Sequence, residues 1–291
     1  MYRPIDQPQR EQGEREPLQR EQRDPGPDLR QGPEKPAICR EPDVVRLRGH
    51  MYRVSQQELE TMHDVGRFRT IAIDDLARHN YRGKTAALQE HLRSLRAQGL
   101  VQARTLWNGP KSERLRVVVL TKLGKELLRL RRQGDPSQAL YAGLVKPAEV
   151  RHDAAIYRMF QAEKLKIERS GGRIRRVVLD YELKQKVYSV LAKLRALPPL
   201  QYAKRQAEVA RQNGLTVVQG KVPLPDLRIE YETPEGEHAQ VDLELTTGHY
   251  HGPALQAKAQ AGFKMYADQG SGSRLSRVLE DRDITVAILS L

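Results

Sequence analysis

The stretch Lys221–Tyr266, KVPLPDLRIEYETPEGEHAQVDLELTTGHYHGPALQAKAQAGFKMY, decides the fold of the C-terminal half. Apolar residues alternate with polar ones in Leu227–Tyr231 and again in Val241–Leu245, and the turn sequence Thr233–Glu237 separates the two runs. Period-2 alternation on both sides of a Pro/Gly turn predicts a β-hairpin. A helix is expected to follow the hairpin. The residues that recur at helical spacing there are Leu255, Ala259, Phe263 and Tyr266.

Two acidic residues occupy matching ends of this predicted hairpin. Asp226 precedes the first strand and Glu244 lies late in the second, so antiparallel pairing brings both carboxylates to one end of the sheet. From the residues alone a structural role stays open. An Asp after a Pro is ordinary turn chemistry, and a Glu on a strand can simply face water.

This layout resembles the core of the PD-(D/E)XK nucleases. In that family the two acids bind a divalent metal, and a lysine two residues after the second acid positions or activates the attacking water. Here Pro225-Asp226 and Glu244 match, whereas Thr246 stands where the family has its lysine. The resemblance implies Asp226 and Glu244 as Mg²⁺ ligands, since Mg²⁺ takes oxygen ligands and can activate water.

Further catalytic candidates come from two neighbouring helices. Lys258, on the helix after the hairpin, lies beside the Leu255 face and is the substitute for the missing lysine, whereas Lys264 lies nearly opposite and is the poorer candidate. Nuclease cores often add a carboxylate from their first helix, and we expect Asp153 in that role. The alternative for Asp153 is a pair with a nearby arginine.

Composition points to a polyanionic partner. The 291 residues carry a net charge of +13, yet residues 1–44 contain eight Lys/Arg and ten Asp/Glu, so the basic excess lies in the rest of the chain. Such an excess suits nucleic acid, although a merely basic protein has the same composition. The single cysteine excludes an internal disulfide and a cysteine-based zinc site. No apolar run reaches the length of a membrane span and no secretion signal is visible, so we expect a cytoplasmic protein without membrane contact.

The chain divides into three predicted parts. Residues 1–50 are rich in Gln, Arg, Glu and Pro and predict a disordered polar tail. Residues 51–134 predict helix, short helix, turn, helix, hairpin and helix, which is the order of a winged helix-turn-helix. Residues 135–291 predict a mixed α/β domain with helix, strand, helical insert, two strands, helix and strand. The expected fold class is therefore α/β (α+β), with a winged helix followed by a PD-(D/E)XK-like domain.

The N-terminal predicted domain carries a candidate surface for double-stranded DNA. In a winged helix the second helix of the motif enters the major groove, and here that helix is predicted over residues 84–98 with Leu88, Leu92 and Leu95 inward. The opposite face, the helix start and the wing tip supply the candidates. The predicted DNA-binding residues are Arg82, Lys84, Thr85, Gln89, Arg93, Arg96, Trp107 and Lys111, with Tyr81 beside them. An ordinary polar face or a dimerisation surface is the alternative.

The combination resembles one family in particular, the replication-relaxation proteins of plasmids and integrative elements. The matching features beyond the winged helix are a helix opening with Arg151-His152-Asp153, acids at Asp180 and Glu182, Pro225-Asp226, and the strand Leu243–Gly248. The resemblance covers residues 55–291 and implies a DNA-associated role in replication, relaxation or mobilisation of a mobile element, as a homodimer or within a larger complex.

Two functions remain open at this point. One is a DNA-binding protein of a mobile element whose nuclease-like domain is inactive, which Thr246 favours. The other is an active Mg²⁺-dependent DNA endonuclease that uses Asp226 and Glu244. Zinc held by His249 and His251 has weak support, because no Cys partner or helical HxxxH spacing accompanies them.

Overall fold

The computed structural model describes residues 43–107, 114–131, 135–143, 146–246, 252–267 and 288–290. These residues form eight helices and three sheets, which confirms a mixed α/β fold. Among them no helix combines the length and the apolar character needed to cross a membrane. The predicted tail up to residue 42, Lys111 and its turn, and His249–His251 lie outside the described residues.

The first described element is a β-hairpin of β1 (Asp43–Leu47) and β2 (His50–Val54). The prediction of a polar tail through residue 50 is therefore wrong for residues 43–50. Val45 and Leu47 alternate with exposed residues along β1, and Tyr52 and Val54 do the same along β2. Burial of that apolar face against the following helices orders the hairpin.

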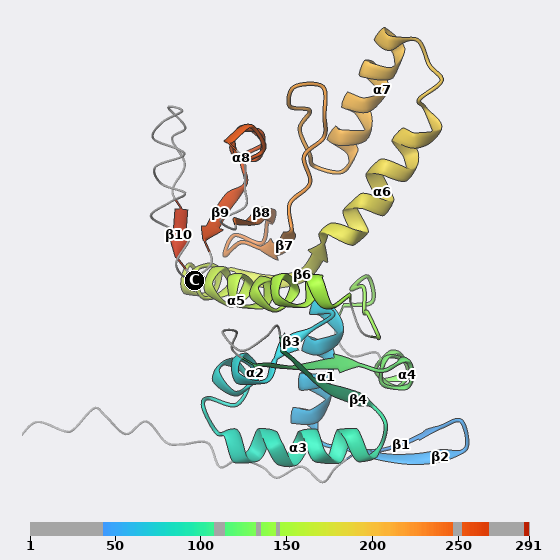
Figure 1. Cartoon of the computed structure of the whole chain (residues 1–291), viewed down its shortest axis with the longest axis vertical. Coiled ribbons are helices and arrows are strands. Elements are labelled where there is room, and N and C mark those ends of the chain that lie inside the picture. The colour runs from blue at the N-terminus through green and yellow to red at the C-terminus, as the bar shows by residue number, and fades with distance from the viewer. Residues whose placement is uncertain are drawn as a thin grey trace, which may run out of the picture. The chain divides into compact units, whose positions relative to one another are not determined.

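The N-terminal half continues with helices and a small sheet (Figure 1). Its elements are α1 (Gln56–Phe68), β3 (Ile71–Ala72), α2 (Ile73–His79), α3 (Thr85–Ala97), β4 (Val101–Leu106), β5 (Leu115–Leu120) and α4 (Lys122–Leu130). A Ser, Thr or Asp directly before a helical pattern predicts a helix cap, here at Ser55, Asp74 and Thr121. The caps at Ser55 and Thr121 are confirmed, since both side chains accept hydrogen bonds from the backbone of their helices. The cap at Asp74 is wrong, because α2 begins one residue earlier.

The C-terminal half contains a five-stranded mixed sheet in the order β10-β9-β8-β7-β6. Its strands are β6 (Arg173–Leu179), β7 (Leu227–Glu232), β8 (His238–Thr246), β9 (Lys264–Ala267) and β10 (Ile288–Ser290). Strands β6, β7 and β8 are antiparallel, and β9 runs parallel to both β8 and β10. The helices are α5 (Pro147–Arg169), α6 (Asp180–Lys193), α7 (Pro199–Gln212) and α8 (Gly252–Gln260).

Two boundaries in this half differ from the sequence prediction. The predicted helix through Phe263 and Tyr266 stops at Gln260, and Tyr266 lies on β9. Gly262 has φ of +83°, a conformation that glycine adopts without strain, and it turns the chain into the strand. The strand that the sequence predicts over residues 173–181 ends at Leu179, and Asp180 begins α6.

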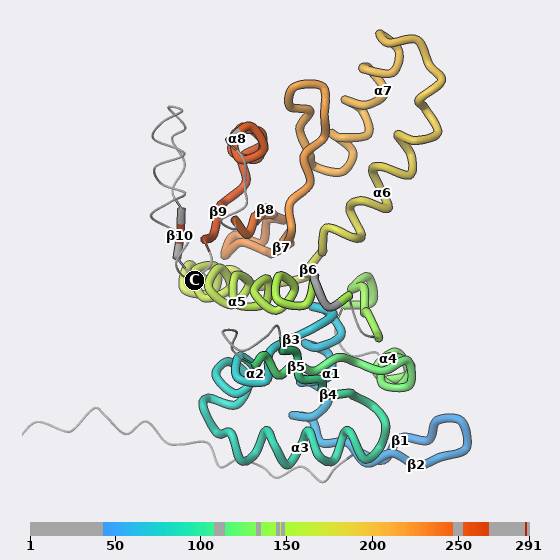
Figure 2. Tube along the Cα trace, viewed as in Figure 1, coloured from blue at the N-terminus to red at the C-terminus, as the bar shows by residue number. Residues whose placement is uncertain are grey.

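Helix α5 packs against elements of both the N-terminal and the C-terminal half. It packs against α1, α2 and β3 and also against β6, β7 and β8 (Figure 1), and Figure 2 shows the same arrangement along the backbone trace. The Phe68 ring lies 5.1 Å from the ring of Tyr157 and 4.8 Å from that of Phe160. One hydrophobic core therefore extends from Val45 to Tyr266, across the boundary predicted at residue 134.

Candidate active site and nucleic-acid interface

The two predicted carboxylates meet at the end of the β7–β8 ladder. Because Leu227 pairs with Leu243, Asp226 lies beside Glu244. The backbone N–H of Asp226 donates to Glu244 Oε2 at 3.3 Å, and the N–H of Leu245 donates to Asp226 Oδ2 at 2.9 Å. Glu244 is fully buried. The predicted convergence of the two acids at one end of the sheet is therefore confirmed.

Lys258 reaches this pair from α8. Its ammonium group lies 2.8 Å from Glu244 Oε2 and also donates to the carbonyl oxygen of Leu224. A buried carboxylate requires such a cation, because an unpaired buried charge is costly. Lys264, in contrast, pairs with Glu163 at 2.6 Å, away from Glu244. The sequence-based preference for Lys258 over Lys264 agrees with this geometry.

Thr246 explains why the lysine comes from elsewhere. Its side chain is fully buried and its hydroxyl donates to the carbonyl oxygen of Tyr266 on β9 at 3.0 Å. Thr246 lies two residues after Glu244 on β8 and therefore shares its face of the sheet, but its side chain carries no positive charge. Position 246 therefore contributes to the strand pairing, and α8 supplies the cation.

His152 joins the carboxylates from the N-terminal part of α5. Its Nε2 lies 3.4 Å from Asp226 Oδ2 and its Nδ1 lies 3.8 Å from Asp153 Oδ1. Burial opposes the imidazolium form, but the carboxylates of Asp153 and Asp226 outweigh it and raise the pKa of His152 to about 10. Burial also opposes ionisation of Asp226, yet His152, the Leu245 N–H and Lys258 hold its pKa below the usual value.

Asp153 is buried and lies behind His152, so its contact with the other two acids is indirect. Its second oxygen lies 3.6 Å from Arg69, the residue that follows α1. The contact with an arginine that was the alternative for Asp153 is confirmed, whereas its role as a further catalytic acid stays a prediction. Among the described residues no group of three His, Cys, Asp or Glu side chains converges as a metal cluster.

Sequence reasoning assigned no role to His152 or Lys184. Lys184 lies one turn into α6 and pairs with Asp180, whose backbone N–H donates to the carbonyl of Asp226 at 3.1 Å. It thereby adds a positive charge near the Asp226 carboxylate. His152 directly precedes the candidate Asp153 in the sequence. Its link to Asp226 could not be read from sequence, because α5 and β7 are more than 50 residues apart.

The described DNA-binding candidates are exposed on α3 and its flanks. Arg82, Lys84, Thr85, Gln89, Arg93, Arg96 and Trp107 are all solvent-exposed, while Leu88, Leu92 and Leu95 are buried as expected. Arg93 and Arg96 line a groove of about 560 Å³ together with Gln102 and Arg104 of β4. The guanidinium of Arg114 lies 6.0 Å from the Trp107 ring, at the described base of the β4–β5 hairpin.

Tyr81 is the exception among the residues expected at this surface. It is buried, and its hydroxyl lies 2.9 Å from both Thr61 Oγ1 and His91 Nδ1. Burial raises the pKa of Tyr81 to about 12. Its expected phosphate contact is therefore wrong, because the ring packs in the core instead of facing solvent.

Sequence reasoning also missed the hairpin as a neighbour of this surface. The backbone of Arg53 on β2 exchanges two hydrogen bonds of 2.9 Å with the side chain of Gln98, which caps α3. The exposed residues Arg46 and Arg53 add positive charge there. The alternation of apolar and basic residues in Val44–Val54 was the signal that could have revealed these strands.

Comparison with models of protein families finds no match for this chain, and comparison with curated protein sequences finds none either.

Proposed function

We propose that this chain is a DNA-binding protein whose C-terminal half is a metal-dependent phosphodiesterase of the PD-(D/E)XK type. The observation that carries the proposal is the convergence of Asp226, Glu244 and Lys258 at one end of the sheet. Two acids and a lysine are the groups that this chemistry requires. Here the lysine comes from α8, so Thr246 at its usual position does not argue against activity.

The carboxylates fit a Mg²⁺ ion. Mg²⁺ keeps several waters and needs only one or two protein carboxylates besides the substrate phosphate, so Asp226 and Glu244 suffice as protein ligands. When bound, the metal would activate a water molecule and neutralise charge that develops on the phosphate.

The chain's own groups have distinct parts in the proposed reaction. Lys258 uses two of its three donors on Glu244 and the Leu224 carbonyl, which leaves one N–H for a water or a phosphate oxygen. His152, protonated at neutral pH, balances the charge of Asp226 and Asp153 and orients both carboxylates. Asp153 acts through His152 and is therefore a positioning residue.

The N-terminal half supports duplex binding. Its order of helices and strands corresponds to a winged helix-turn-helix, with α3 as the recognition helix and the β4–β5 hairpin as the wing. The exposed cations on α3 suit phosphate contacts, and Gln89 suits a base edge.

A second cationic surface begins next to the carboxylates. Helices α6 and α7 form a helical hairpin (Figure 1), and many of its exposed residues are basic. These residues are Lys184, Lys186, Lys193, Arg195, Lys204, Arg205 and Arg211. Such a surface would hold a phosphate backbone close to Asp226.

A non-catalytic DNA-binding regulator is the second candidate. The observation in its favour is that His152 already provides a positive charge beside Asp226, which competes with a metal ion for that carboxylate. The role in a plasmid or integrative element, and assembly as a homodimer or in a replication or mobilisation complex, follow from the resemblance to replication-relaxation proteins.

The test is incubation of plasmid and linear duplex DNA with Mg²⁺ or Mn²⁺, with cleavage and gel shift scored in parallel. Asp226→Asn and Glu244→Gln should abolish cutting and preserve the gel shift. Glu163→Gln is the matched control, because Glu163 is another buried acid of the same half that lies away from the site. If the wild type shifts DNA but does not cut it, the nuclease proposal is wrong and the non-catalytic regulator is supported. A wild type that neither binds nor cuts DNA would refute both candidates.

A further inference from the structure

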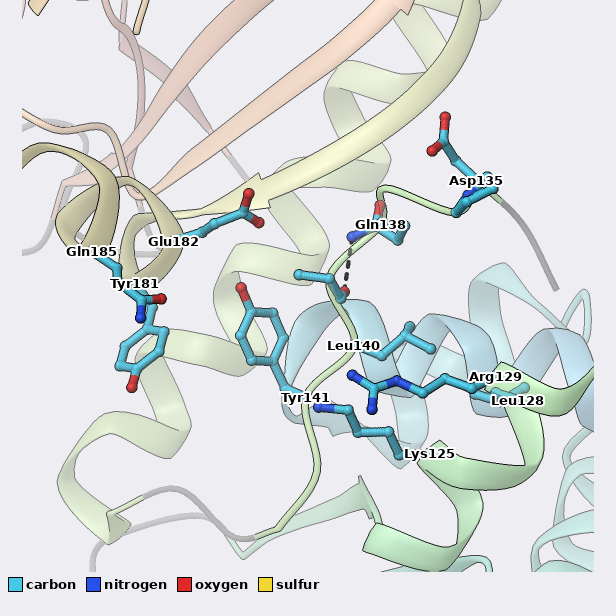
Figure 3. Close-up of a pocket in the computed structure, with 12 residues that line it drawn as sticks. Lys125, Leu128, Arg129, Asp135, Gln138, Leu140, Tyr141, Tyr181, Glu182 and Gln185 are labelled. Atoms are coloured by element: carbon cyan, nitrogen blue, oxygen red, sulfur yellow. Dashed lines mark hydrogen bonds between the residues drawn. The ribbon is translucent and has the colours of Figure 1, made fainter. Parts of the chain in front are cut away.

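A pocket of about 710 Å³ is lined neither by Asp226, Glu244 or Asp153 nor by any residue of α3. It is lined by α4, by the connector around Asp135–Tyr141, and by the first two turns of α6 (Figure 3). Its volume is within the roughly 300–1,000 Å³ that is typical of small-molecule sites. None of its lining residues belongs to the proposed active site or to the predicted DNA surface.

The connector wall is held in place by the protein itself. The Gln138 side chain exchanges two hydrogen bonds of 2.9 Å with the backbone of Val177 on β6. The N–H of Tyr141 donates to the Gly66 carbonyl and the N–H of Gly143 donates to the Leu120 carbonyl, both at 2.8 Å. The pocket is therefore preformed, so a ligand would not have to order this segment.

One wall of the pocket presents two cations, Lys125 and Arg129. Lys125 and Arg129 lie one turn apart on α4 and line the pocket with their side chains (Figure 3). Within the described part of the chain no carboxylate lies within ion-pair distance of either one. Burial and the neighbouring Arg129 both lower the pKa of Lys125. An anionic group bound between these two side chains would relieve their repulsion.

The two acids that line the pocket, Asp135 and Glu182, interact with groups outside α4. Glu182 pairs with Arg176 and, at 2.9 Å, with Lys186. Asp135 accepts hydrogen bonds from the backbone N–H and the hydroxyl of Ser137. Neither acid therefore neutralises the cations of α4.

The other walls are aromatic and apolar. Tyr141 and Tyr181 meet edge to face with their ring centroids 6.3 Å apart, and Leu128 and Leu140 add apolar surface. A flat ring can stack or pack by its edge against such tyrosines. The amide of Gln185 at the rim offers hydrogen bonds to polar ring edges.

We propose that this pocket binds a small planar aromatic anion of the nucleotide class. The phosphate would lie between Lys125 and Arg129, and the base would lie against Tyr141 and Tyr181. The site is carried by residues that the proposed nuclease function does not use. Because its walls come from α4 and from α6, an occupant would contact the helix that follows the predicted wing and the base of the α6–α7 hairpin.

The test is calorimetric titration of the full chain with a panel of nucleoside monophosphates, with inorganic phosphate and a short single-stranded oligonucleotide as further probes. We expect saturable binding at one site for at least one mononucleotide. Lys125→Gln combined with Arg129→Gln should weaken it at least about tenfold, since hydrogen bonds to charged groups are the stronger kind. Tyr181→Ala should weaken it by a smaller factor.

Lys122→Gln is the matched control, because Lys122 is an exposed lysine on the same helix that does not line the pocket. Circular dichroism melts would verify that each variant is folded. Absence of saturable binding up to millimolar nucleotide, or binding that the pocket variants leave unchanged, would overturn the proposal. If inorganic phosphate binds as tightly as the nucleotides, the proposed contact of the base with Tyr141 and Tyr181 is wrong. Binding of the oligonucleotide alone, abolished in the pocket variants, would also overturn the mononucleotide proposal, because the pocket would then take a nucleic-acid strand.

Discussion

Glu244 is completely buried, and the ammonium group of Lys258 is its cationic partner at 2.8 Å. A comparable pair exists elsewhere in the same half, where Lys264 lies 2.6 Å from the buried Glu163. The two pairs allow the structural contribution of a buried ion pair to be separated from a contribution to catalysis.

We predict that Lys258→Met lowers metal-dependent DNA cleavage by at least about a hundredfold, which is the effect of removing one donor that stabilises a developing negative charge. Lys264→Met should leave cleavage within a few-fold of the wild type. Both variants should be less stable, because each removes a cation from a buried carboxylate. Glu163 keeps Lys166 at 3.5 Å after Lys264→Met, so this variant should lose less stability. Single-turnover cleavage rates and thermal melts measure the two effects. An equal fall in cleavage in both variants would show that Lys258 contributes to stability and has no specific role in cleavage.

His63 on α1 gives a prediction about acid stability. Burial, aided by Arg67, lowers its pKa to about 4, so the folded protein favours the neutral ring. A base with a depressed folded pKa contributes stability that is present above its unfolded pKa of about 6.5 and is lost as the pH falls toward 4. As the pH falls from 6.5 toward 4, the free energy of unfolding of the wild type should decrease by on the order of 1–3 kcal/mol more than that of His63→Gln. Urea unfolding at pH 7 and at pH 4.5 measures the difference, and identical losses in the two proteins would contradict the assignment.

At the scale of elements, α3 presents a leucine face to the core and a cationic face to solvent. Replacement of Arg93 and Arg96 by Gln should weaken duplex binding and reduce the salt slope by about one for each DNA phosphate that is no longer neutralised. Gel shifts at several salt concentrations would measure both quantities. Arg169→Gln with Arg173→Gln removes the same charge from exposed positions at the C-terminal end of α5 and on β6. If this control pair had the same effect, binding would depend on net charge and not on α3.

The close approach of α4 to Leu100, just before β4, depends on Gly124. A Cβ there would lie 2.2 Å from the Leu100 carbonyl oxygen and 2.8 Å from Leu120 Cδ1. Gly124→Ala should therefore destabilise the fold by roughly 1–3 kcal/mol, although Ala is the better helix former. At Gly66 the nearest atoms are the ends of two leucine side chains, at 3.0 and 3.1 Å, so Gly66→Ala should cost less. Urea unfolding measures the loss of unfolding free energy in both variants. A larger loss in Gly66→Ala than in Gly124→Ala would contradict this packing.

At the scale of the whole molecule, α5 connects the two halves. It supplies Tyr157 and Phe160 to the Phe68 cluster, and the Tyr157 hydroxyl donates to Asn80 at 2.6 Å. The same helix brings His152 to the carboxylates of the sheet. Because α5 belongs to one continuous core, the two halves should unfold together.

Phe160→Ala tests this coupling. Removal of a buried ring should cost about 3–5 kcal/mol. Hydrogen exchange followed by mass spectrometry should show faster global exchange in both β5 and β8, although these strands belong to different sheets. Faster exchange confined to one of the two strands would show that the halves are independently stable.

Much of this protein follows from the sequence alone, because the deciding interactions are local. Period-2 alternation predicted β7 and β8, leucine spacing predicted α3, and the side chains of Ser55 and Thr121 predicted two helix starts. The proximity of Asp226 and Glu244 also followed, since a hairpin register brings residues at matching strand ends together.

The tertiary structure decided what depends on interactions between distant segments. Tyr266 has helical spacing with Leu255 and Phe263 yet lies on β9, because a parallel strand beside β8 pairs backbone groups that no local pattern reveals. Tyr81 is buried because Thr61 and His91 bind its hydroxyl. The pairing of Lys258 with Glu244 and of His152 with Asp226 arises only when α8 and α5 pack on the sheet, since side chains far apart in sequence meet only in the folded chain.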